Sequence, residues 1–445
     1  MGLTLLLGLS LLLTTAIASD GGEVTNPQSS CSSKSSTGDF PSSVHLTLHH
    51  PRDPCSPAPL PPLPFSTILH HDDHRAHSLA HRASGRSSSS SSVSAPLTPG
   101  TSVGVGNYVT RIGLGTPSKT YIVVVDTGSS LSWLQCSPCN VSCHDQVGPV
   151  FDPSSSTSYR PVPCSASECS SLPSATLNPS GCSESKVCVY EASYGDSSFS
   201  VGYLSRDTLS IASLSVPGFV YGCGQDNEGL FGQSAGLIGL AKNKLSLLSQ
   251  VAPKVGSLAF SYCLPTTSST GFVSFGPYAA SKFSYTPMVS NSMDDTLYFV
   301  KLAAITVAGK SLPVSSSSYS GTPTIIDSGT VITRLPSDVY SALADALSAS
   351  LSKYKKAPAY SILDTCFVGS VRGLAVPEVS LVFAGGATMR LPPRNVFIDV
   401  DGDTTCVAFA PSGRVAIVGN RQQQTFNVVY DVEKARVGFA AGGCG

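Results

Sequence analysis

The stretch VVVDTGSS at Val123 to Ser130 returns further along the chain in altered form, as TIIDSGT at Thr324 to Thr330. In both copies, apolar β-branched residues run into Asp-Thr-Gly or Asp-Ser-Gly, which predicts a buried strand that ends in a tight turn with a carboxylate at its tip. One such turn alone is most simply a β-turn whose polar side chain satisfies its own backbone. Two copies behind the same kind of strand indicate a duplication.

The duplication extends beyond the two turns. AGLIGL at Ala235 to Leu240 follows the first turn, and VAIVGN at Val415 to Asn420 follows the second. Each half therefore has a strand, an Asp-Thr/Ser-Gly turn, further strands, and then aliphatic residues before a glycine. Two such lobes could face each other about a pseudo-two-fold axis, which would bring Asp126 and Asp327 together in the cleft between them.

The sequence pattern beyond Leu97 is typical of a mainly β protein. With 445 residues, of which 41% are hydrophobic and 12% charged, the chain can bury one large core or two. Few segments have a convincing helical spacing of apolar residues; the best is Pro336–Leu351, and Phe65–Ala83 could form another helix. Elsewhere short β-branched and aromatic runs alternate with Gly, Pro and Ser. The predicted strands are Tyr108–Leu114, Tyr121–Val125, Val216–Tyr221, Tyr298–Val307, Val379–Phe383 and Val428–Val432.

The N-terminal part has the composition of a leader. Met1 to Ser19 holds an apolar core followed by small residues, which predicts a secretory signal peptide, whereas a membrane anchor would need a longer apolar run. Residues 20–96 are rich in Ser, Pro and His and end in the nearly all-serine run Arg86 to Ser94, which is typical of an accessible linker. The C-terminus lacks the hydrophobic tail of a lipid-anchor signal. We therefore expect a secreted chain without a membrane anchor.

The cysteines point to an oxidising compartment. The chain has 14 cysteines, an even number that fits a set of disulfides. Cys136, Cys139 and Cys143 together with His144 leave a zinc site open as an alternative, because they supply four plausible ligands. In a secreted chain we favour disulfides and no bound metal.

The positions of the histidines and the net charge disfavour two classes of function. Only His144 of the nine histidines lies beyond the serine run, so nucleophilic catalysis by Ser-His-Asp or Cys-His is disfavoured in the domain after the linker. Chemistry by carboxylates remains. The formal charge of −1 and the lack of a basic run argue against a nucleic-acid partner. The histidines before the linker are His45, His49, His50, His70, His71, His74, His77 and His81.

Taken together, these features resemble the pepsin-like aspartic proteases, and more closely the plant nepenthesin-like group. The similarity covers nearly everything after Leu97, and the leader segments VHLT at 44–47 and PCSP at 54–57 also resemble prosegments of that group. The motifs that carry the resemblance are Asp126-Thr-Gly-Ser129, Asp327-Ser-Gly-Thr330, Trp133, Tyr194-Gly-Asp196, the two aliphatic-glycine segments, and a cysteine pattern with a Cys-rich insert before Tyr194.

The resemblance implies a bilobal pepsin-like fold. Its parts would be a signal peptide at 1–19, a prosegment and linker at 20–96, an N-terminal protease lobe at 97–290 and a C-terminal lobe at 291–445. It also implies an aspartic endopeptidase made as a zymogen and active at acidic pH. Such a protein would act on polypeptides as a monomer without a cofactor, with its own prosegment as inhibitor. Secretion to the apoplast is expected, with the vacuole or a plastid as alternatives.

In this reading Asp126 and Asp327 form the catalytic dyad. Two carboxylates in contact cannot both ionise cheaply, so the pair shares a proton. The ionised member can then take a proton from water while the protonated member polarises the scissile carbonyl. Gly128 and Gly329 lack a Cβ, which lets the turns approach closely. By resemblance, Ser129 and Thr330 donate hydrogen bonds that orient the pair.

The resemblance also assigns a flap, a hairpin that closes over bound peptide. It carries Tyr194 and Gly195, with Trp133 beneath Tyr194 as a hydrogen-bond partner. The chain departs from the group at Ser197 and Ala241, where glycine is usual or frequent, and a stiffer flap tip could alter specificity or turnover. The disulfides implied by analogy are Cys136–Cys139, Cys143–Cys223, Cys164–Cys188, Cys169–Cys182, Cys263–Cys444 and Cys366–Cys406.

Three further hypotheses remain open. The rival function is a catalytically weak or inactive binding protein on the same fold, such as the inhibitors of polysaccharide-degrading enzymes among plant relatives, although an intact dyad and Tyr194 favour the enzyme. The histidines between His70 and His81 could form a pH sensor on one helix, or simply a solvated polar segment. Asn140, in the sequon Asn-Val-Ser, is a candidate glycosylation site.

Overall fold

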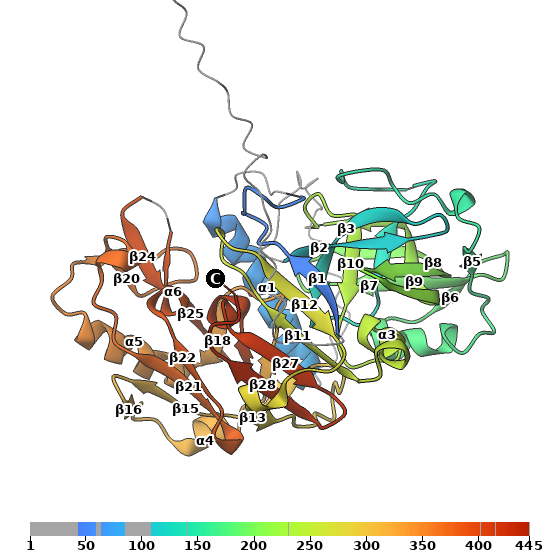
Figure 1. Cartoon of the computed structure of the whole chain (residues 1–445). Coiled ribbons are helices and arrows are strands. Elements are labelled where there is room, and N and C mark those ends of the chain that lie inside the picture. The colour runs from blue at the N-terminus through green and yellow to red at the C-terminus, as the bar shows by residue number, and fades with distance from the viewer. Residues whose placement is uncertain are drawn as a thin grey trace, which may run out of the picture. The chain divides into compact units, whose positions relative to one another are not determined.

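The computed structural model describes residues 43–58, 64–84, 108–139, 141–229, 231–400, 402–413 and 415–444. All of them belong to one compact unit, Ser33–Gly445. The expected signal peptide at 1–19, the serine run Arg86 to Ser94 and the sequon residue Asn140 lie outside the described residues. Strands dominate the described part (Figure 1), which confirms the mainly β prediction.

A nine-stranded sheet in the N-terminal half places the first Asp turn at the end of a buried strand. Strand β3 (Lys119–Asp126) is buried from Tyr121 onward and runs parallel to β10 (Gly236–Gly239), with Asp126 opposite Gly239. The other strands are β2 (Val109–Leu114) beside β3, then β4 (Trp133–Gln135), β9 (Leu214–Glu228), β8 (Phe199–Ile211), β7 (Cys188–Ser193) and β6 (Gly181–Cys182) beyond β10, with β5 (Arg160–Pro161) on β8.

The C-terminal half repeats this arrangement. Strand β17 (Thr324–Ile326) runs parallel to β26 (Ala416–Val418), so Asp327 leaves its strand beside the second aliphatic-glycine segment. The same parallel pairing in both halves confirms the duplication. The sheet is completed by β14 (Phe299–Val300), β18 (Thr333–Pro336) and β25 (Phe409–Ser412). Two four-stranded sheets consist of β16 (Lys310–Ser311), β15 (Leu302–Val307), β21 (Val379–Phe383) and β22 (Thr388–Leu391), and of β19 (Lys356–Ala357), β20 (Cys366–Val368), β24 (Thr404–Val407) and β23 (Phe397–Asp399).

A six-stranded sheet combines both halves with the leader. Leader strand β1 (Val44–Leu48) pairs antiparallel with β12, and the two C-terminal strands β27 and β28 lie further across the same sheet (Figure 1). The leader strand is therefore an integral part of this sheet. In spatial order after β1, the strands are β12 (Gly271–Phe275), β11 (Ala259–Cys263), β27 (Asn427–Asp431), β28 (Arg436–Ala440) and β13 (Ser284–Pro287).

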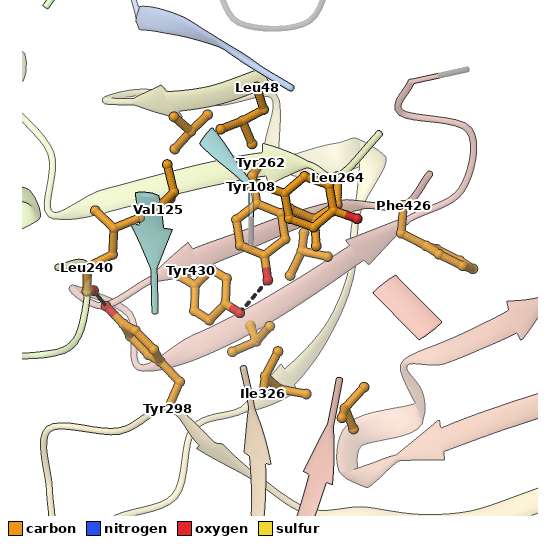
Figure 2. Packing of buried hydrophobic residues seen from close by; sticks show 14 of the residues in the cluster. Leu48, Tyr108, Val125, Leu240, Tyr262, Leu264, Tyr298, Ile326, Phe426 and Tyr430 are labelled. Atoms are coloured by element: carbon orange, nitrogen blue, oxygen red, sulfur yellow. Dashed lines mark hydrogen bonds between the residues drawn. The ribbon is translucent and has the colours of Figure 1, made fainter. Parts of the chain in front are cut away.

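Buried tyrosines connect this sheet to the strands that carry the Asp turns. The hydroxyls of Tyr262 and Tyr430 lie 2.8 Å apart, and the Tyr298 hydroxyl donates to the Leu240 carbonyl at 2.6 Å (Figure 2). A buried tyrosine is stable only when its hydroxyl finds a partner, which these pairs provide. The core next to Val125 and Ile326 is thus fixed by hydrogen bonds as well as by packing.

Both predicted helices are present. Helix α1 (Phe65–Ser84) buries Leu69, Ala76 and Leu79 along one stripe, and α5 (Ser337–Ser350) buries its apolar positions in the C-terminal half. No helix in the described part of the chain is both long and apolar enough to cross a membrane. The remaining helices are α2 (Leu172–Thr176), α3 (Leu247–Val255), α4 (Ser316–Ser320), α6 (Pro393–Val396) and α7 (Asn420–Gln423).

Among the described residues, six disulfides form. Cys263–Cys444 and Cys366–Cys406 match the expected pairs. The other four expected pairings are wrong, because the structure joins Cys136–Cys223, Cys139–Cys143, Cys164–Cys182 and Cys169–Cys188.

Strand neighbours and burial explain the difference. Strands β4 and β9 are parallel with Leu134 opposite Cys223, so Cys136 emerges beside Cys223 in the core, and the loop cysteines pair with each other. In the Cys-rich insert, the two buried cysteines form one disulfide and the two more exposed ones form the other. Since Cys136, Cys139 and Cys143 are all in disulfides, the zinc alternative loses its thiolate ligands.

Candidate active site

The two Asp turns meet in the interior. The side chains of Asp126 and Asp327 are 1% and 0% exposed, and each accepts a hydrogen bond from the N–H of the glycine two residues on, at 3.0 and 3.2 Å. A Cβ on Gly128 would lie 3.0 Å from the Asp327 Oδ1 atom, and one on Gly329 would lie 2.6 Å from the Asp126 Oδ1 atom. A Cβ at either position would crowd the opposite carboxylate, so the close approach of the turns favours glycine at both.

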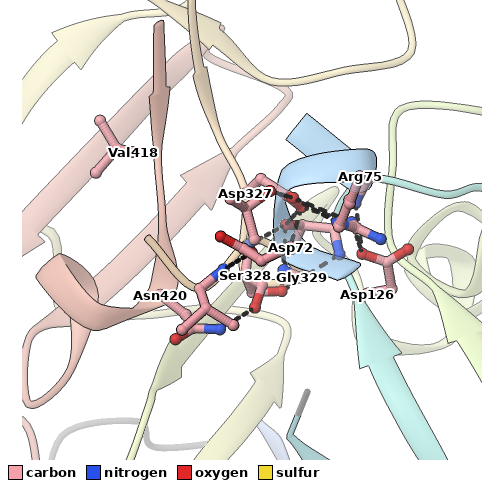
Figure 3. Close-up of polar contacts among 12 residues, drawn as sticks. Asp72, Arg75, Asp126, Asp327, Ser328, Gly329, Val418 and Asn420 are labelled. Atoms are coloured by element: carbon pink, nitrogen blue, oxygen red, sulfur yellow. Dashed lines mark hydrogen bonds and ion pairs between the residues drawn. The ribbon is translucent and has the colours of Figure 1, made fainter. Parts of the chain in front are cut away.

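The middle residues of both turns interlock across the pseudo-two-fold axis. The Ser328 N–H donates to the Thr127 hydroxyl at 2.9 Å, and the Thr127 hydroxyl also reaches Asp327 Oδ1 at 3.3 Å. Asn420 then holds the Ser328 carbonyl through its side-chain amide at 3.0 Å (Figure 3). Sequence reasoning gave Thr127 and Ser328 no role, although a hydroxyl at the second position of both turns was a visible signal.

The two hydroxyls expected to orient the dyad behave differently. The Thr330 hydroxyl donates to Asp327 Oδ2 at 2.6 Å, as expected. Within the described residues, Ser129 Oγ and Asp126 Oδ2 are both buried without a hydrogen-bond partner. The expected contact between Ser129 and Asp126 is therefore absent, and the two carboxylates of the dyad are held unequally.

A leader arginine lies between the two carboxylates. Arg75 of α1 donates from Nη2 to Asp126 Oδ1 at 2.6 Å and from Nε to Asp327 Oδ2 at 3.0 Å (Figure 3). Burial alone would raise the pKa of Asp327, but Arg75, the Thr330 hydroxyl and the Gly329 N–H hold it below its ordinary value. Charge-assisted hydrogen bonds from Arg75 to both carboxylates hold the guanidinium between them.

A carboxylate of α1, Asp72, also contacts the segment after the second Asp turn. Asp72 accepts hydrogen bonds from the N–H groups of Val331 and Ile332 and pairs with Arg334 at 3.2 Å. Burial raises the pKa of Asp72, although Arg334 and these N–H groups act in the opposite direction. A carboxylate within the apolar stripe of a helix is the sequence signal that could have revealed this contact.

Arg82 extends the docking of α1 past the first Asp turn. It donates to Asp294 Oδ2 at 2.8 Å and to the Gly128 carbonyl at 2.9 Å. Burial would raise the pKa of Asp294, but Arg82 and Thr296 lower it. A cavity of about 640 Å³ is lined here by Asp126, Asp294, the flap and α1.

The flap forms as expected at the turn between β7 and β8. Trp133 Nε1 donates to the Tyr194 hydroxyl at 2.7 Å, which ties the flap tyrosine to β4. A Cβ on Gly195 would lie 2.3 Å from Ser78 Cβ, so the flap is pressed against α1. Ser197 has φ 70°, a left-handed conformation that favours glycine.

The leader histidines do not face the dyad as a group. Of the five on α1, only His71 is half-buried, and burial lowers its pKa, whereas His70, His74, His77 and His81 are exposed. Within the described residues, no cluster of three or more His, Cys, Asp or Glu side chains is arranged to bind a metal ion. The ionisable groups concentrated at the site are the two dyad carboxylates and the charged residues of α1.

Comparison with known proteins agrees with this geometry. The family models described as "Xylanase inhibitor N-terminal" and "Xylanase inhibitor C-terminal" match residues 108–277 and 297–441. An aspartyl protease family protein of Arabidopsis thaliana is 44% identical over 364 residues, which cover 80% of this chain and 76% of that protein. Aspartic proteinase nepenthesin-2 of Nepenthes gracilis is 36% identical over 375 residues, 80% of this chain and 81% of that protein.

Among solved structures, basic 7S globulin from soybean superposes with a TM-score of 0.61 at 22% identity, covering 77% of this chain and 94% of that one. At that identity the likeness establishes the fold alone. The duplicated Asp turns, the bilobal sheets and the protease relatives lead to one conclusion: the chain belongs to the pepsin-like aspartic protease family, in its plant nepenthesin-like group.

Proposed function

We propose that this protein is an aspartic endopeptidase made as an inactive zymogen, which becomes active at acidic pH when α1 leaves the cleft. The observation that carries the proposal is the placement of Arg75 between Asp126 and Asp327. A catalytic dyad must bind water and a scissile carbonyl at this position, and the guanidinium excludes both. The protease relatives support polypeptides as the substrates.

The dyad performs hydrolysis once Arg75 has gone and the pair holds one shared proton. The ionised carboxylate takes a proton from water, the water oxygen forms a bond to the carbonyl carbon, and the protonated carboxyl gives its proton to the carbonyl oxygen. The resulting tetrahedral diol collapses when a carboxyl protonates the amide nitrogen. The C–N bond then breaks, and one diol hydroxyl returns its proton to the dyad. No covalent enzyme intermediate forms.

The leader is suited to an inhibitory role because it combines charge pairing with apolar burial. Leu69 packs against the segment after the second Asp turn, while Ala76 and Leu79 pack against Phe299 and Ile325. Buried apolar area supplies most of the binding free energy in such contacts, and Arg75 fixes the register. We propose a monomeric precursor whose leader acts in cis.

The disulfides support folding in an oxidising compartment, so we propose export to the apoplast, with the vacuole or a plastid as alternative destinations.

A binding protein on the same fold is the rival function, and the xylanase-inhibitor description of the family models is its support. Against it, both carboxylates, the Thr330 hydroxyl and the Trp133–Tyr194 pair are all in place, which a purely binding protein does not need.

The test is to acidify the full chain from pH 7 to 4 and to follow leader cleavage and the hydrolysis of an added peptide. Asp126→Asn and Asp327→Asn should each lower both rates by at least about 100-fold, because each removes half of the shared-proton pair. Asp345→Asn, an exposed change on α5, is the matched control and should cleave normally. Near-normal cleavage by either dyad variant, with unchanged circular dichroism, would overturn the proposed mechanism.

A further inference from the structure

The leader carboxylate Asp72 occupies a site that is built for an anion. Its two oxygens accept hydrogen bonds from the consecutive N–H groups of Val331 and Ile332, the second at 3.1 Å. The Arg334 guanidinium lies 3.2 Å from Asp72 Oδ2 on the same side. Two adjacent backbone donors and a guanidinium are a typical carboxylate receptor.

The cation of this receptor is buried and depends on the leader. The Arg334 side chain is 2% exposed, among the largest fully buried side chains of the described residues. Its carboxylate contacts in the described part of the chain are Asp72 and Asp73, both on α1, and the guanidinium also donates to the Ile332 carbonyl at 3.0 Å. When α1 departs, the charge therefore loses both of its counter-ions.

The receptor adjoins the dyad. Asp72 precedes Arg75 by three residues on the same face of α1, which is less than one helical turn. Val331 and Ile332 directly follow the second Asp turn, and Arg334 lies on β18 immediately beyond them, with Ala410 and Ile417 as its strand partners. The receptor therefore lies directly after the turn that carries Asp327, next to the place of a scissile bond held by the dyad.

We propose that Arg334, with the N–H groups of Val331 and Ile332, forms a specificity subsite of the mature cleft that takes an acidic side chain of the substrate. The leader fills this subsite with Asp72 in the closed form. The inference rests on the proposed protease function and adds the class of peptide that the cleft prefers.

The selectivity follows from the cost of a buried charge without a partner. A neutral side chain lying over Arg334 would exclude water from the guanidinium and provide no counter-charge. An Asp or Glu side chain would restore the pairing that Asp72 provides and would satisfy both N–H groups. Discrimination therefore comes as much from the penalty on neutral residues as from attraction to acidic ones.

A carboxylate can come from an internal Asp or Glu, or from the C-terminus of a short peptide. We commit to the internal side chain, because Asp72 reaches the receptor as a side chain from a continuous backbone. Peptides with an amidated C-terminus test this choice, since they retain only side-chain carboxylates. If selectivity appears only with a free C-terminus, the internal assignment is wrong.

The experiment uses the acid-matured enzyme and end-blocked peptides that differ only by Asp or Asn at one position on either side of the scissile bond. At about pH 5 the Asp side chain is ionised, because its ordinary pKa is near 3.9. At one position the kcat/KM of the Asp peptide should exceed that of the Asn peptide by about 10- to 100-fold. A ratio near one at every position would overturn the proposal without any variant being made.

Variants then assign the effect to Arg334. Arg334→Gln should bring the Asp/Asn ratio toward one while the Asn peptide is still cleaved, and Arg334→Lys should retain part of the ratio because it keeps the charge but loses the planar fork. Arg390→Gln, an exposed arginine of β22, is the control for loss of one positive charge and should keep the full ratio. If Arg334→Gln does not fold, the Lys variant and the wild-type ratio still decide.

A readout without turnover separates this inference from the proposed function. The same peptides are bound to the matured Asp126→Asn variant, after leader removal by an added protease, and the ratio of the two Kd values is measured. Tighter binding of the Asp peptide without cleavage by the wild type would retain the subsite and refute the protease. Cleavage with no Asp preference in either assay would retain the protease and refute the subsite.

Discussion

The two leader segments in the structure hold the protease part by different physics. Helix α1 places Arg75 on the dyad and leaves four of its five histidines in solvent. Strand β1 and the residues after it add to the six-stranded sheet and pack His49 and His50 against the protein, where His50 contacts the Tyr108 ring at a centroid distance of 5.6 Å. The contact with the dyad and the buried histidines therefore lie in separate parts of the segment before the linker.

Protonation differs between the segments accordingly. Burial, followed by the charges of Arg421 and Arg52, lowers the pKa of His50 to about 3, and burial with Arg111 lowers that of His49 against the opposing charge of Asp53. Both histidines have a lower pKa when the leader is docked than when it is free. Their contribution to the stability of the docked leader is therefore fully present above the ordinary histidine pKa of 6.5. It is lost progressively as pH falls from about 6.5 toward 3.

The carboxylates of the α1 side act at lower pH. The pKa values of Asp327 and Asp294 are lowered in the closed form, so their contribution is present above the ordinary Asp pKa of 3.8 and is lost as pH falls through the lowered values. Asp72 has the opposite sign, because its raised pKa favours the closed form on protonation. We therefore expect acid release to begin at the β1 segment and to be completed at the dyad.

The largest expected effect on leader cleavage comes from a change in helix α1. Arg75→Gln leaves the buried dyad without its cation, which should cost about 3 kcal/mol of α1 docking. The midpoint of leader cleavage should move to higher pH, and cleavage at pH 6 should accelerate at least about 10-fold. The measurement is the rate of leader cleavage between pH 7 and 4.

Arg82→Gln is the matched control for Arg75→Gln. It removes the same charge from the same helix, but its partner Asp294 lies outside the dyad, so we expect a smaller shift in the same direction. An equal or larger shift for Arg82 would mean that docking as a whole, and not the dyad contact, sets the inhibition.

A change at His50, just after strand β1, should have an intermediate effect on leader cleavage. His50→Gln removes a group that resists protonation in the closed form but not in the open one, so the midpoint of leader cleavage should fall, by about one pH unit. Replacing His70, His74, His77 and His81 together by Gln is the control and should leave the midpoint unchanged, because all four are exposed. If only the fourfold variant shifted the midpoint, the helix would be the sensor after all.

The features that could be predicted from the sequence are those set by residues close together in the chain or by a family pattern. The strand before each Asp turn, the glycines of the turns and helix α1 are readable from apolar spacing and turn chemistry, and the structure has them. The Trp133–Tyr194 contact came from resemblance and is confirmed by a direct hydrogen bond. In these cases a few neighbouring residues, or one family pattern, contain the information.

What could not be predicted depends on which strands become neighbours. Cys136 joins Cys223 because β4 and β9 are adjacent, and no spacing along the chain contains that adjacency. Arg75 reaches both Asp turns only when α1 docks across both halves, so a leader arginine looks like any solvated cation in the sequence. Within the described part of the chain the Ser129 hydroxyl has no hydrogen-bond partner, whereas that of Thr330 does, so even a repeated motif does not guarantee repeated contacts.

The smallest expected effect concerns the flap, which contacts α1 at Gly195. Ser197→Gly relieves a left-handed backbone at φ 70° that costs a non-glycine residue about 1 kcal/mol. The greater freedom of glycine in the unfolded chain offsets most of this gain, so the Tm should change by only a few degrees. Amide exchange should accelerate in residues 194–199 and at the α1 face beneath them, while β1 stays as protected as before. Ser197→Ala removes the same hydroxyl without relieving the backbone, so it should leave the exchange unchanged. If the Ala variant reproduces the Gly variant, the hydroxyl and not the backbone controls the flap, and the difference between the two leader segments does not depend on the flap tip.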